Sequence, residues 1–281
     1  MPIRLKLDAT FAAKIAASTR AQIGVWVCSG SATVAEICAS SGVDWILIDS
    51  EHTPNSLESI VAQLQAVQGY PATPLVRPPH GDPQLIKQYL DLGVQNLLVP
   101  MVDTAADAKA LVSAVRYPPR GIRGVGSALA RASRWNRVEN YLQNADDSIA
   151  LFVQVETVTS VANIDEILAV EGIAGIFVGP SDLAASMGLL GQQDHPDVVA
   201  AVESVIAKAK AAGVPVGVNA FAPATADRYI AAGVDFIVVG ADVAILARAT
   251  EALADRFIPA ASAANPSPET NASPESGRTS Y

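Results

Sequence analysis

Residues 45–52 of the chain read WILIDSEH. Four apolar residues without polar alternation come first, and such a run is typical of a strand that is buried on both faces in a parallel sheet. The run ends on Asp49, Glu51 and His52. Functional side chains in such folds lie beyond the carboxyl ends of the strands. This stretch therefore predicts a buried strand and, at its end, one wall of a site.

The same arrangement recurs as PLVR at 74–77, LFVQVE at 151–156 and GIFVGPSD at 175–182. Each run is short and apolar and leads to a polar residue that is able to do chemistry. In a parallel sheet the carboxyl ends of the strands share one edge. We therefore expect one edge to gather His52, Arg77, Glu156 and Asp182.

Eight apolar runs are spaced along the chain, at residues 22–28, 45–49, 74–77, 96–100, 151–155, 175–178, 215–219 and 235–240. Most intervals between them hold an amphipathic stretch, and glycine often precedes the next run, as expected where a helix ends. Eight strand-helix units in 281 residues predict an α/β fold, a closed (β/α)₈ TIM barrel in one domain, residues 1–258.

Two segments depart from this rhythm. Residues 117–147 form an insertion before the fifth strand, and an insertion of this length is usually functional or involved in subunit contact. Residues 259–281 are rich in Pro, Ser, Ala and Asn and have little to bury, so we expect a disordered C-terminal tail.

Charge and composition exclude several classes of protein. A net charge of −9 argues against nucleic acid and anionic membranes as partners, although a small anionic substrate needs only one or two local cations. No membrane span, signal sequence or disulfide framework is recognisable, so we expect a cytoplasmic protein. The sequence contains no Walker loop and no GxGxxG motif, so it does not predict an organic cofactor. All six lysines fall at the N-terminus or in helical patterns, which disfavours a Schiff-base mechanism.

The two carboxylates are the strongest candidates for chemistry. Glu156 ends the fifth strand and Asp182 follows the sixth, so neighbouring strands of a barrel bring them together. Paired carboxylates with open positions suit a hard divalent ion such as Mg²⁺ or Mn²⁺. Taken alone, Asp182 is better interpreted as a helix cap. Glu156 favours the metal, because a charge at the end of so apolar a run needs compensation.

Two further residues suit acid–base chemistry and charge stabilisation. For His52, beyond a buried strand, a general base and a structural role are about equally favoured. Arg77 is either a partner in an ion pair between loops or a fixed cation beside a developing oxyanion. The amides around Ser181 begin a helix and offer a place for a carboxylate.

Taken together, the motifs resemble a known enzyme family. They are similar to motifs of the metal-dependent, pyruvate-specific class II aldolases: IDSEH at 48–52, VRP at 76–78, LVPMV at 98–102, RYPPRGIRGVG at 116–126, QVE at 154–156 and VGPSDL at 178–183. SALARASRWNR at 127–137 is particularly similar to the 4-hydroxy-2-oxoheptanedioate type of this family. The likeness leaves out only the C-terminal tail and the first residues.

The resemblance implies a role for each candidate. Glu156 and Asp182 would hold a divalent ion (Mg²⁺, Mn²⁺ or Co²⁺), and His52 would be the base. Arg77 would stabilise an enolate. Contacts to the substrate would come from Gln154 and from the amides of Ser181 and Asp182.

The resemblance also makes Asp91 a partner that raises the basicity of His52. Asp91, however, ends the helix after the third strand, and the pattern places that point at the opposite face of the barrel. We therefore hypothesise that Asp91 reaches the site of a neighbouring subunit. The family likeness implies a homo-oligomer, a hexamer. Ser50 stands where the family usually has glycine, and we expect it to shift His52 slightly without abolishing activity.

The implied reaction is the reversible cleavage of 4-hydroxy-2-oxo acids to pyruvate and an aldehyde through a metal-stabilised pyruvate enolate. The aldehyde of the most similar type is succinate semialdehyde, a product of aromatic catabolism. One alternative is a related aldolase that acts on 2-dehydro-3-deoxy sugar acids, of the glucarate or rhamnonate type. Others are a phosphate-binding barrel, suggested by residues 240–242, and a catalytically silent barrel, although Glu156, Asp182 and Arg77 are all present.

Overall fold

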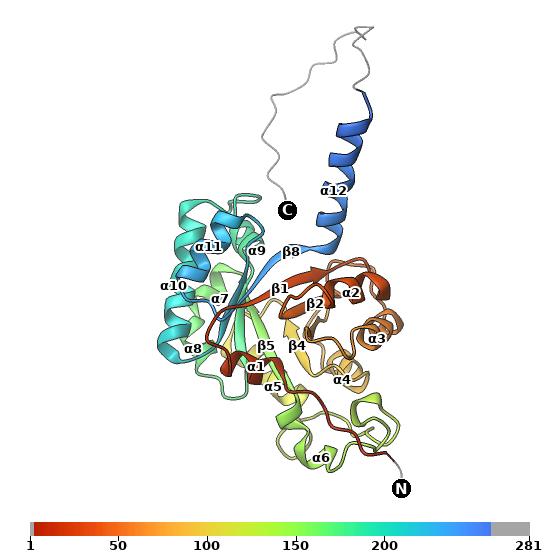
Figure 1. Cartoon of the computed structure of the whole chain (residues 1–281). Coiled ribbons are helices and arrows are strands. Elements are labelled where there is room, and N and C mark those ends of the chain that lie inside the picture. Colours follow the sequence, from red (N-terminus) through yellow and green to blue (C-terminus); the bar gives the residue numbers. More distant parts are fainter. Residues whose placement is uncertain (1–2, 260–281) are drawn as a thin grey trace, which may run out of the picture.

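The computed structural model describes residues 3–259, which form a closed barrel of parallel strands in sequence order (Figure 1). The strands are β1 (Gln22–Val27), β2 (Trp45–Asp49), β3 (Thr73–Arg77), β4 (Asn96–Val99), β5 (Ala150–Val155), β6 (Gly175–Val178), β7 (Val216–Asn219) and β8 (Phe236–Ala241). The predicted (β/α)₈ barrel is confirmed, and every predicted strand end is within one residue of the observed one. The predicted tail, from residue 260 onward, lies outside the described residues.

Helices connect the strands, and most of them cover the outside of the barrel. They are α1 (Phe11–Ala16) before β1, then α2 (Ala32–Ala39), α3 (Leu57–Ala66), α4 (Pro83–Asp91), α5 (Ala105–Val115), α7 (Val158–Ala162), α8 (Ile164–Leu168), α9 (Pro180–Ser186), α10 (Pro196–Ala212), α11 (Pro223–Ala231) and α12 (Asp242–Phe257). Several begin at a side-chain cap. Ser56, Thr104 and Thr157 each form a capping box, which satisfies backbone amides that the first helical turn leaves free. No helix among residues 3–259 is long and apolar enough to span a membrane.

The inside of the barrel is filled by large rings rather than by a channel. Phe11 of α1 closes the lower end, with ring centroids 5.1 Å from Trp45 and 5.4 Å from Phe236. Its backbone N–H donates to Asn96 Oδ1 at 2.7 Å, which holds α1 against the start of β4. Alternate residues of the strands face the helices outside, so both faces of the sheet are buried, as the uninterrupted apolar runs predict.

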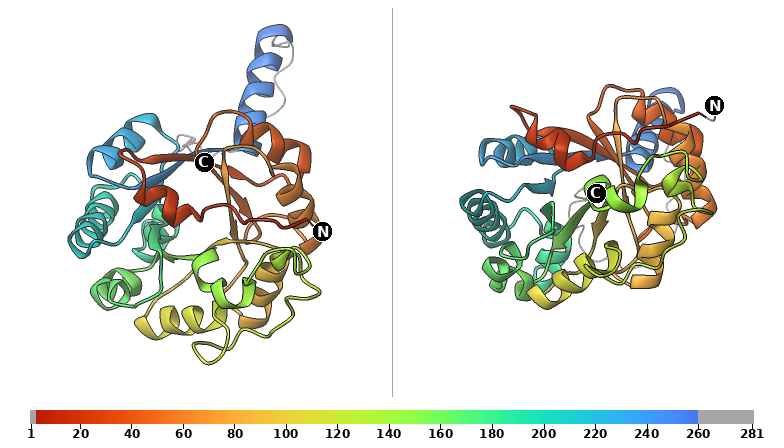
Figure 2. Two further views of the ribbon diagram at one scale, coloured as in Figure 1. Left: turned by 60° about the horizontal axis from the view of Figure 1, so that its bottom comes forward. Right: turned by 90° about the horizontal axis from the view of Figure 1, so that it is seen from below.

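The insertion lies at the end of the barrel where the strands begin. It contains η1 (Arg131–Ser133), α6 (Tyr141–Asn144) and η2 (Asp146–Ser148). Seen from below, the green insertion and red α1 lie across the same end of the barrel (Figure 2). Arg123 anchors the insertion: its side chain is buried, and its guanidinium carbon lies 4.6 Å from the centroid of the Tyr117 ring.

Helix α12 departs from the barrel. It projects away from the end where the strands finish, instead of lying against the sheet as the other outer helices do (Figure 1). Asp242, at its start, is its only buried residue. Its exposed apolar side chains include Val243, Ile245, Leu246, Leu253 and Phe257. The apolar face of this helix is therefore not covered by the rest of the described chain.

Gly24 makes room for a ring inside the barrel, and this generates the first prediction. A Cβ atom at Gly24 would lie 2.3 Å from the Trp45 ring, whereas one at Gly240 of β8 would meet no atom closer than 3.4 Å. We expect Gly24→Ala to lower the free energy of unfolding by about 1–3 kcal/mol, because an overpacked core must shift. Urea denaturation measures it, with Gly240→Ala as control. Equal effects of the two substitutions would contradict this account.

Candidate active site

A buried arginine organises the edge where the strands end. Arg77, the last residue of β3, is 6% exposed. Its Nε donates to Asp49 Oδ1 at 2.7 Å, and its Nη1 forms an ion pair with Glu51 Oε2 at 2.9 Å. Its guanidinium carbon lies 5.0 Å from the centroid of the Trp26 ring. Burial lowers the pKa of Arg77, but the hydrogen bond to Asp49 and the charges of Asp49 and Glu51 raise it by more, so the net pKa is raised. Arg77 is therefore a permanent cation.

Glu156 follows β5 and is held by two donors. Its Oε1 accepts a hydrogen bond from the backbone N–H of Met101 at 2.7 Å, and its Oε2 accepts one from Gln154 Nε2 at 2.5 Å. Met101 has a φ of 57°, in the left-handed region that non-glycine residues rarely adopt. A Cβ atom at Gly179 would lie 2.5 Å from Glu156 Oε2, so only glycine allows this close approach.

Gln154 joins these two charged groups. While its Nε2 donates to Glu156, its Oε1 accepts a hydrogen bond from Arg77 Nη1 at 3.3 Å. The side chain is buried, and both ends of its amide are occupied. The structure thus places Gln154 in the predicted site as a bridge between Arg77 and Glu156.

Negative charge accumulates at this edge. Burial raises the pKa of Glu156 to about 7, and the charges of Asp182 and Glu51 add to the rise, while the hydrogen bonds from Met101 and Gln154 oppose it. Burial likewise raises the pKa of Glu51, against the charge of Arg77 and together with the charges of Asp49 and Asp182. A bound cation would relieve this repulsion among carboxylates.

Ser181 and Asp182 lie in the first turn of α9. The N-cap of this helix is Gly179, and no side chain makes a capping hydrogen bond there, so the interpretation of Asp182 as a helix cap was wrong. Asp182 is exposed, and within residues 3–259 its carboxylate accepts no hydrogen bond. It is therefore free to bind a ligand beside Glu156.

His52 lies on the same edge but outside the buried network. Its side chain is 65% exposed, with Nε2 at 3.8 Å from Glu51 Oε2, and its backbone N–H donates to Asp49 Oδ2 at 3.3 Å. Ser50 is buried next to it, and its backbone N–H donates to the carbonyl of Arg77. Ser50 is not among the residues with positive φ, so the loop does not require glycine at this position.

Asp91 lies elsewhere in the chain. It ends α4, and its Oδ1 accepts a hydrogen bond from Nη2 of buried Arg123 at 2.9 Å. Arg123 belongs to the insertion, which lies at the end of the barrel where the strands begin, whereas His52 follows the end of β2. Within one chain, Asp91 is therefore a partner of the insertion.

The phosphate-binding alternative finds no support at the start of α12. The carboxylate of Asp242 accepts hydrogen bonds from the backbone N–H groups of Cys28 at 2.8 Å and Ser29 at 3.0 Å. Asp242 thus ties the end of β1 to the end of β8 and takes up amides that a phosphate would need. Burial, together with Asp49 and Asp242, also raises the pKa of Cys28 to about 12, which makes this thiol unreactive.

The sequence pattern missed several members of the site. Asp49 and Glu51 were noted only as acidic neighbours of His52, and their pairing with Arg77 follows from the register of β2 with β3, in which Asp49 lies opposite Arg77. Trp26 and the amide of Met101 left no signal, because one acts through its ring and the other through its backbone. In the described part of the chain, no three His, Cys, Asp or Glu side chains converge as ready-made metal ligands.

Comparison with known proteins identifies the family. The family model for HpcH/HpaI aldolase/citrate lyase matches residues 22–249, and the chain belongs to this family. It is therefore an aldolase-type lyase, as the resemblance implied.

Among its relatives is a hydroxypyruvate/pyruvate aldolase of Deinococcus radiodurans, 53% identical over 92% of this chain and 94% of the relative. A 4-hydroxy-2-oxo-heptane-1,7-dioate aldolase of Shigella sonnei is 51% identical over 88% of this chain and 94% of the relative. The crystal structure of a family protein from Burkholderia cenocepacia superposes with a TM-score of 0.84, at 39% identity over 87% of this chain and 97% of the other.

The raised pKa of Glu156 predicts a pH-dependent stability. The folded chain holds this proton more tightly than the unfolded chain does, since about 7 exceeds the ordinary value of 4.5. Stability is therefore unaffected below pH 4.5 and falls as the pH rises towards 7. In metal-free buffer we expect the free energy of unfolding of Glu156→Gln, relative to that of the native chain, to rise by roughly 1–3 kcal/mol from pH 5 to pH 8. Urea denaturation at both pH values measures it, and Glu171→Gln, at an exposed position, is the control. A gain that is independent of pH would refute this.

Proposed function

We propose that this chain is a divalent-metal-dependent pyruvate aldolase, which reversibly cleaves 4-hydroxy-2-oxo acids to pyruvate and an aldehyde. The observation that carries the proposal is Arg77, a buried and permanent cation at the edge where carboxylates gather. An enolate needs a fixed positive charge beside its developing oxyanion, in a place from which water is excluded. The resemblance to the 4-hydroxy-2-oxoheptanedioate type makes succinate semialdehyde the first candidate for the aldehyde.

The donor set suits a hard divalent ion. Glu156 and Asp182 offer only oxygen ligands, and the repulsion between neighbouring carboxylates at this edge favours a bound cation. A carboxylate oxygen that accepts one hydrogen bond keeps a lone pair, so Glu156 can bind an ion without losing Met101 or Gln154. We propose that Glu156 and Asp182 hold Mg²⁺, Mn²⁺ or Co²⁺ and leave its other positions open. When bound, the ion would supply Lewis acidity towards the keto acid.

The protein's own groups would divide the remaining work. Arg77 stabilises the negative charge that develops on the keto oxygen, and Asp49 and Glu51 hold its guanidinium in place. His52, exposed beside Glu51, takes the proton of the C4 hydroxyl group, after which the C3–C4 bond breaks and its electron pair forms the enolate. The free amides at the start of α9, at Ser181 and Asp182, receive the substrate carboxylate. Gln154 keeps Arg77 and Glu156 in register.

A second substrate class is favoured by a cavity next to α9. The cavity, about 420 Å³, is lined by Ser181, Asp194, Asn219, Thr225 and the ring of Phe221. It holds one carboxylate and no lysine or arginine. Within residues 3–259, buried Tyr229 Oη and Gln193 Oε1 in its wall have no hydrogen-bond partner. Such a lining suits a neutral hydroxylated aldehyde better than an aldehyde that ends in a carboxylate. A neutral hydroxylated aldehyde is the product expected from the rhamnonate type of 2-dehydro-3-deoxy sugar acid.

Activity and metal dependence can be tested together. We expect retro-aldol cleavage, followed by pyruvate release, to disappear in EDTA and to return with Mg²⁺, Mn²⁺ or Co²⁺. Arg77→Lys should lower kcat by roughly 100-fold or more, as the loss of an oxyanion donor does. Borohydride with pyruvate should leave the mass of the protein unchanged, because none of the six lysines lies at the edge where the strands end.

The panel of substrates should include 4-hydroxy-2-oxoheptanedioate and the rhamnonate- and glucarate-type sugar acids. A larger kcat/KM for the rhamnonate type would select the second substrate class. Activity that survives chelation, or borohydride trapping, would reject the proposed mechanism.

The oligomer is part of the proposal. The exposed apolar face of α12 includes Ile245, Leu246 and Phe257, and a chain with such a projecting face has a strong reason to associate. We propose a homo-oligomer, a hexamer by family likeness, in which Asp91 of one subunit comes close to His52 of another.

Subunit mixing tests this arrangement. His52→Gln and Asp91→Asn should each be inactive alone, whereas a 1:1 mixed oligomer should regain activity in about a quarter of its sites, those that combine native residues from two chains. A mixture of His52→Gln with Arg77→Lys is the control, because both residues belong to the edge of one barrel and no site regains both. Failure of the first mixture, or recovery in the control, would disprove the shared site.

A further inference from the structure

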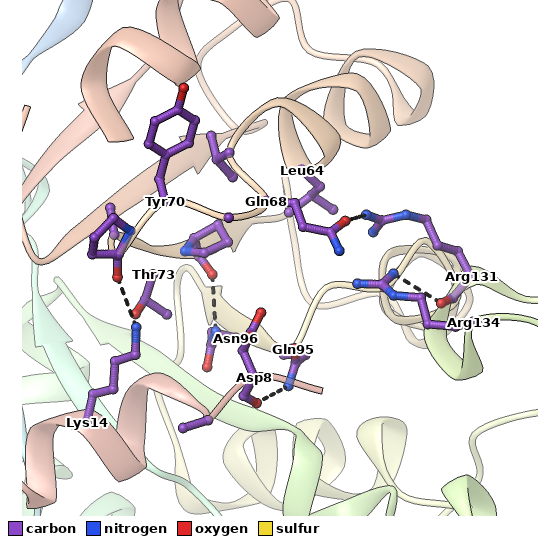
Figure 3. Close-up of a pocket in the computed structure, with 17 residues that line it drawn as sticks. Asp8, Lys14, Leu64, Gln68, Tyr70, Thr73, Gln95, Asn96, Arg131 and Arg134 are labelled. Carbon is purple, nitrogen blue, oxygen red and sulfur yellow. Dashed lines mark hydrogen bonds between the residues drawn. The ribbon is translucent and has the colours of Figure 1, made fainter. Parts of the chain in front are cut away.

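A second pocket borders the starts of β3 and β4 and therefore lies at the opposite end of the barrel from the candidate active site. Figure 3 shows the residues that line it. The pocket has a volume of about 390 Å³, within the range of small-molecule sites. Its wall is made by the segment before β1, the loop after α3, the starts of β3 and β4, and the insertion. In the close-up Lys14 stands on one side, and Arg131 and Arg134 stand on the other.

The charge of this pocket runs against the charge of the chain. The protein carries a net charge of −9, but the pocket is lined by Lys14, Arg131 and Arg134 against a single carboxylate, Asp8, which leaves it at +2. Among residues 3–259, none of these three cations has a carboxylate oxygen within 4 Å. Elsewhere the chain pairs its cations readily, as in Lys210 with Asp235 at 2.6 Å.

The two arginines converge beside the end of α4. A Cβ atom at Gly93 would lie 2.8 Å from Arg131 Nη1 and 3.1 Å from Arg134 Nη1, so both guanidinium groups flank the same point. Burial and the charge of Arg134 lower the pKa of Arg131 to about 10. The two positive charges repel each other, and an anion bound beside both would offset that repulsion.

Their hydrogen-bonding capacity is only partly used. Arg131 donates to the carbonyl of Leu92 at 3.0 Å and to Gln68 Oε1 at 3.3 Å, which gives it a structural role at the end of α4. In the described part of the chain, Arg134 donates only to the carbonyl of Arg131. Lys14 donates one hydrogen bond, to the carbonyl of Pro71, out of the three it can make. Donors therefore remain for a ligand on both sides of the pocket.

We propose that this pocket binds a small, doubly charged oxyanion, such as a phosphate or a short dicarboxylate, between the arginine pair and Lys14. A dianion matches the charge of +2, and the planar guanidinium group binds the oxygens of either class in pairs. The site is separate from the candidate active site, because it borders Thr73 at the start of β3, whereas Arg77 ends that strand. It does not rest on the proposed function.

Calorimetric titration of the full-length protein with inorganic phosphate, and separately with succinate, tests the proposal at constant ionic strength set with KCl. We expect saturable binding of at least one of these anions. Arg134→Gln should weaken that binding at least tenfold, and Lys14→Gln should weaken it in the same direction. Arg137→Gln is the matched control, because Arg137 belongs to the same segment, does not line the pocket and lies against Trp135. It should change binding less than twofold.

The two anions, phosphate and succinate, distinguish the possible classes of ligand. Binding of phosphate alone indicates a phosphorylated ligand, binding of succinate alone a dicarboxylate, and binding of both a general dianion site; each supports the proposal. An anion bound at the active-site edge gives a signal that survives Arg134→Gln, so only the component that this variant loses is counted. Lack of any saturable binding, or equal binding by the Arg134→Gln and Arg137→Gln proteins, overturns the proposal.

Discussion

The ion pair between Arg77 and Asp49 is the constraint on which the carboxyl edge of the barrel depends. A buried guanidinium costs several kcal/mol in lost hydration unless it is fully paired, so the strand that carries it must lie where its partners can reach it. Asp49 is opposite Arg77 in the β2–β3 register, Trp26 covers the guanidinium from β1, and Gln154 reaches it from β5. Four strands are thereby held in one register around a single positive charge.

The same constraint explains why carboxylates can crowd there. Arg77 compensates Asp49 and Glu51, and Glu156, which it does not contact, depends on neutral donors instead. Those donors are specific to this geometry: the left-handed backbone of Met101 turns its N–H group towards the carboxylate, and Gly179 leaves space for it. Arg77 therefore compensates Asp49 and Glu51, whereas among residues 3–259 no cation forms an ion pair with Glu156.

The barrel was predictable because most residues of its strands are apolar, and the residues that end the strands could be placed on one edge from the topology. Pairing within the site was not predictable, since it depends on which side chains meet across strands: Glu51 and not Asp91 proved to be the carboxylate beside His52 in the chain. The course of α12 was also hidden, because an amphipathic pattern shows that a helix has an apolar face and does not show which chain covers it. The need for glycine at residue 179 was hidden as well, because the group that comes closest to it is the side chain of Glu156.

The Phe11 side chain, stacked among the rings of Trp45 and Phe236, seals one end of the barrel. No solute can pass along the axis, because a layer of aromatic rings separates the two ends of the barrel. Small molecules at the edge where the strands end can therefore enter and leave only on that side of the barrel.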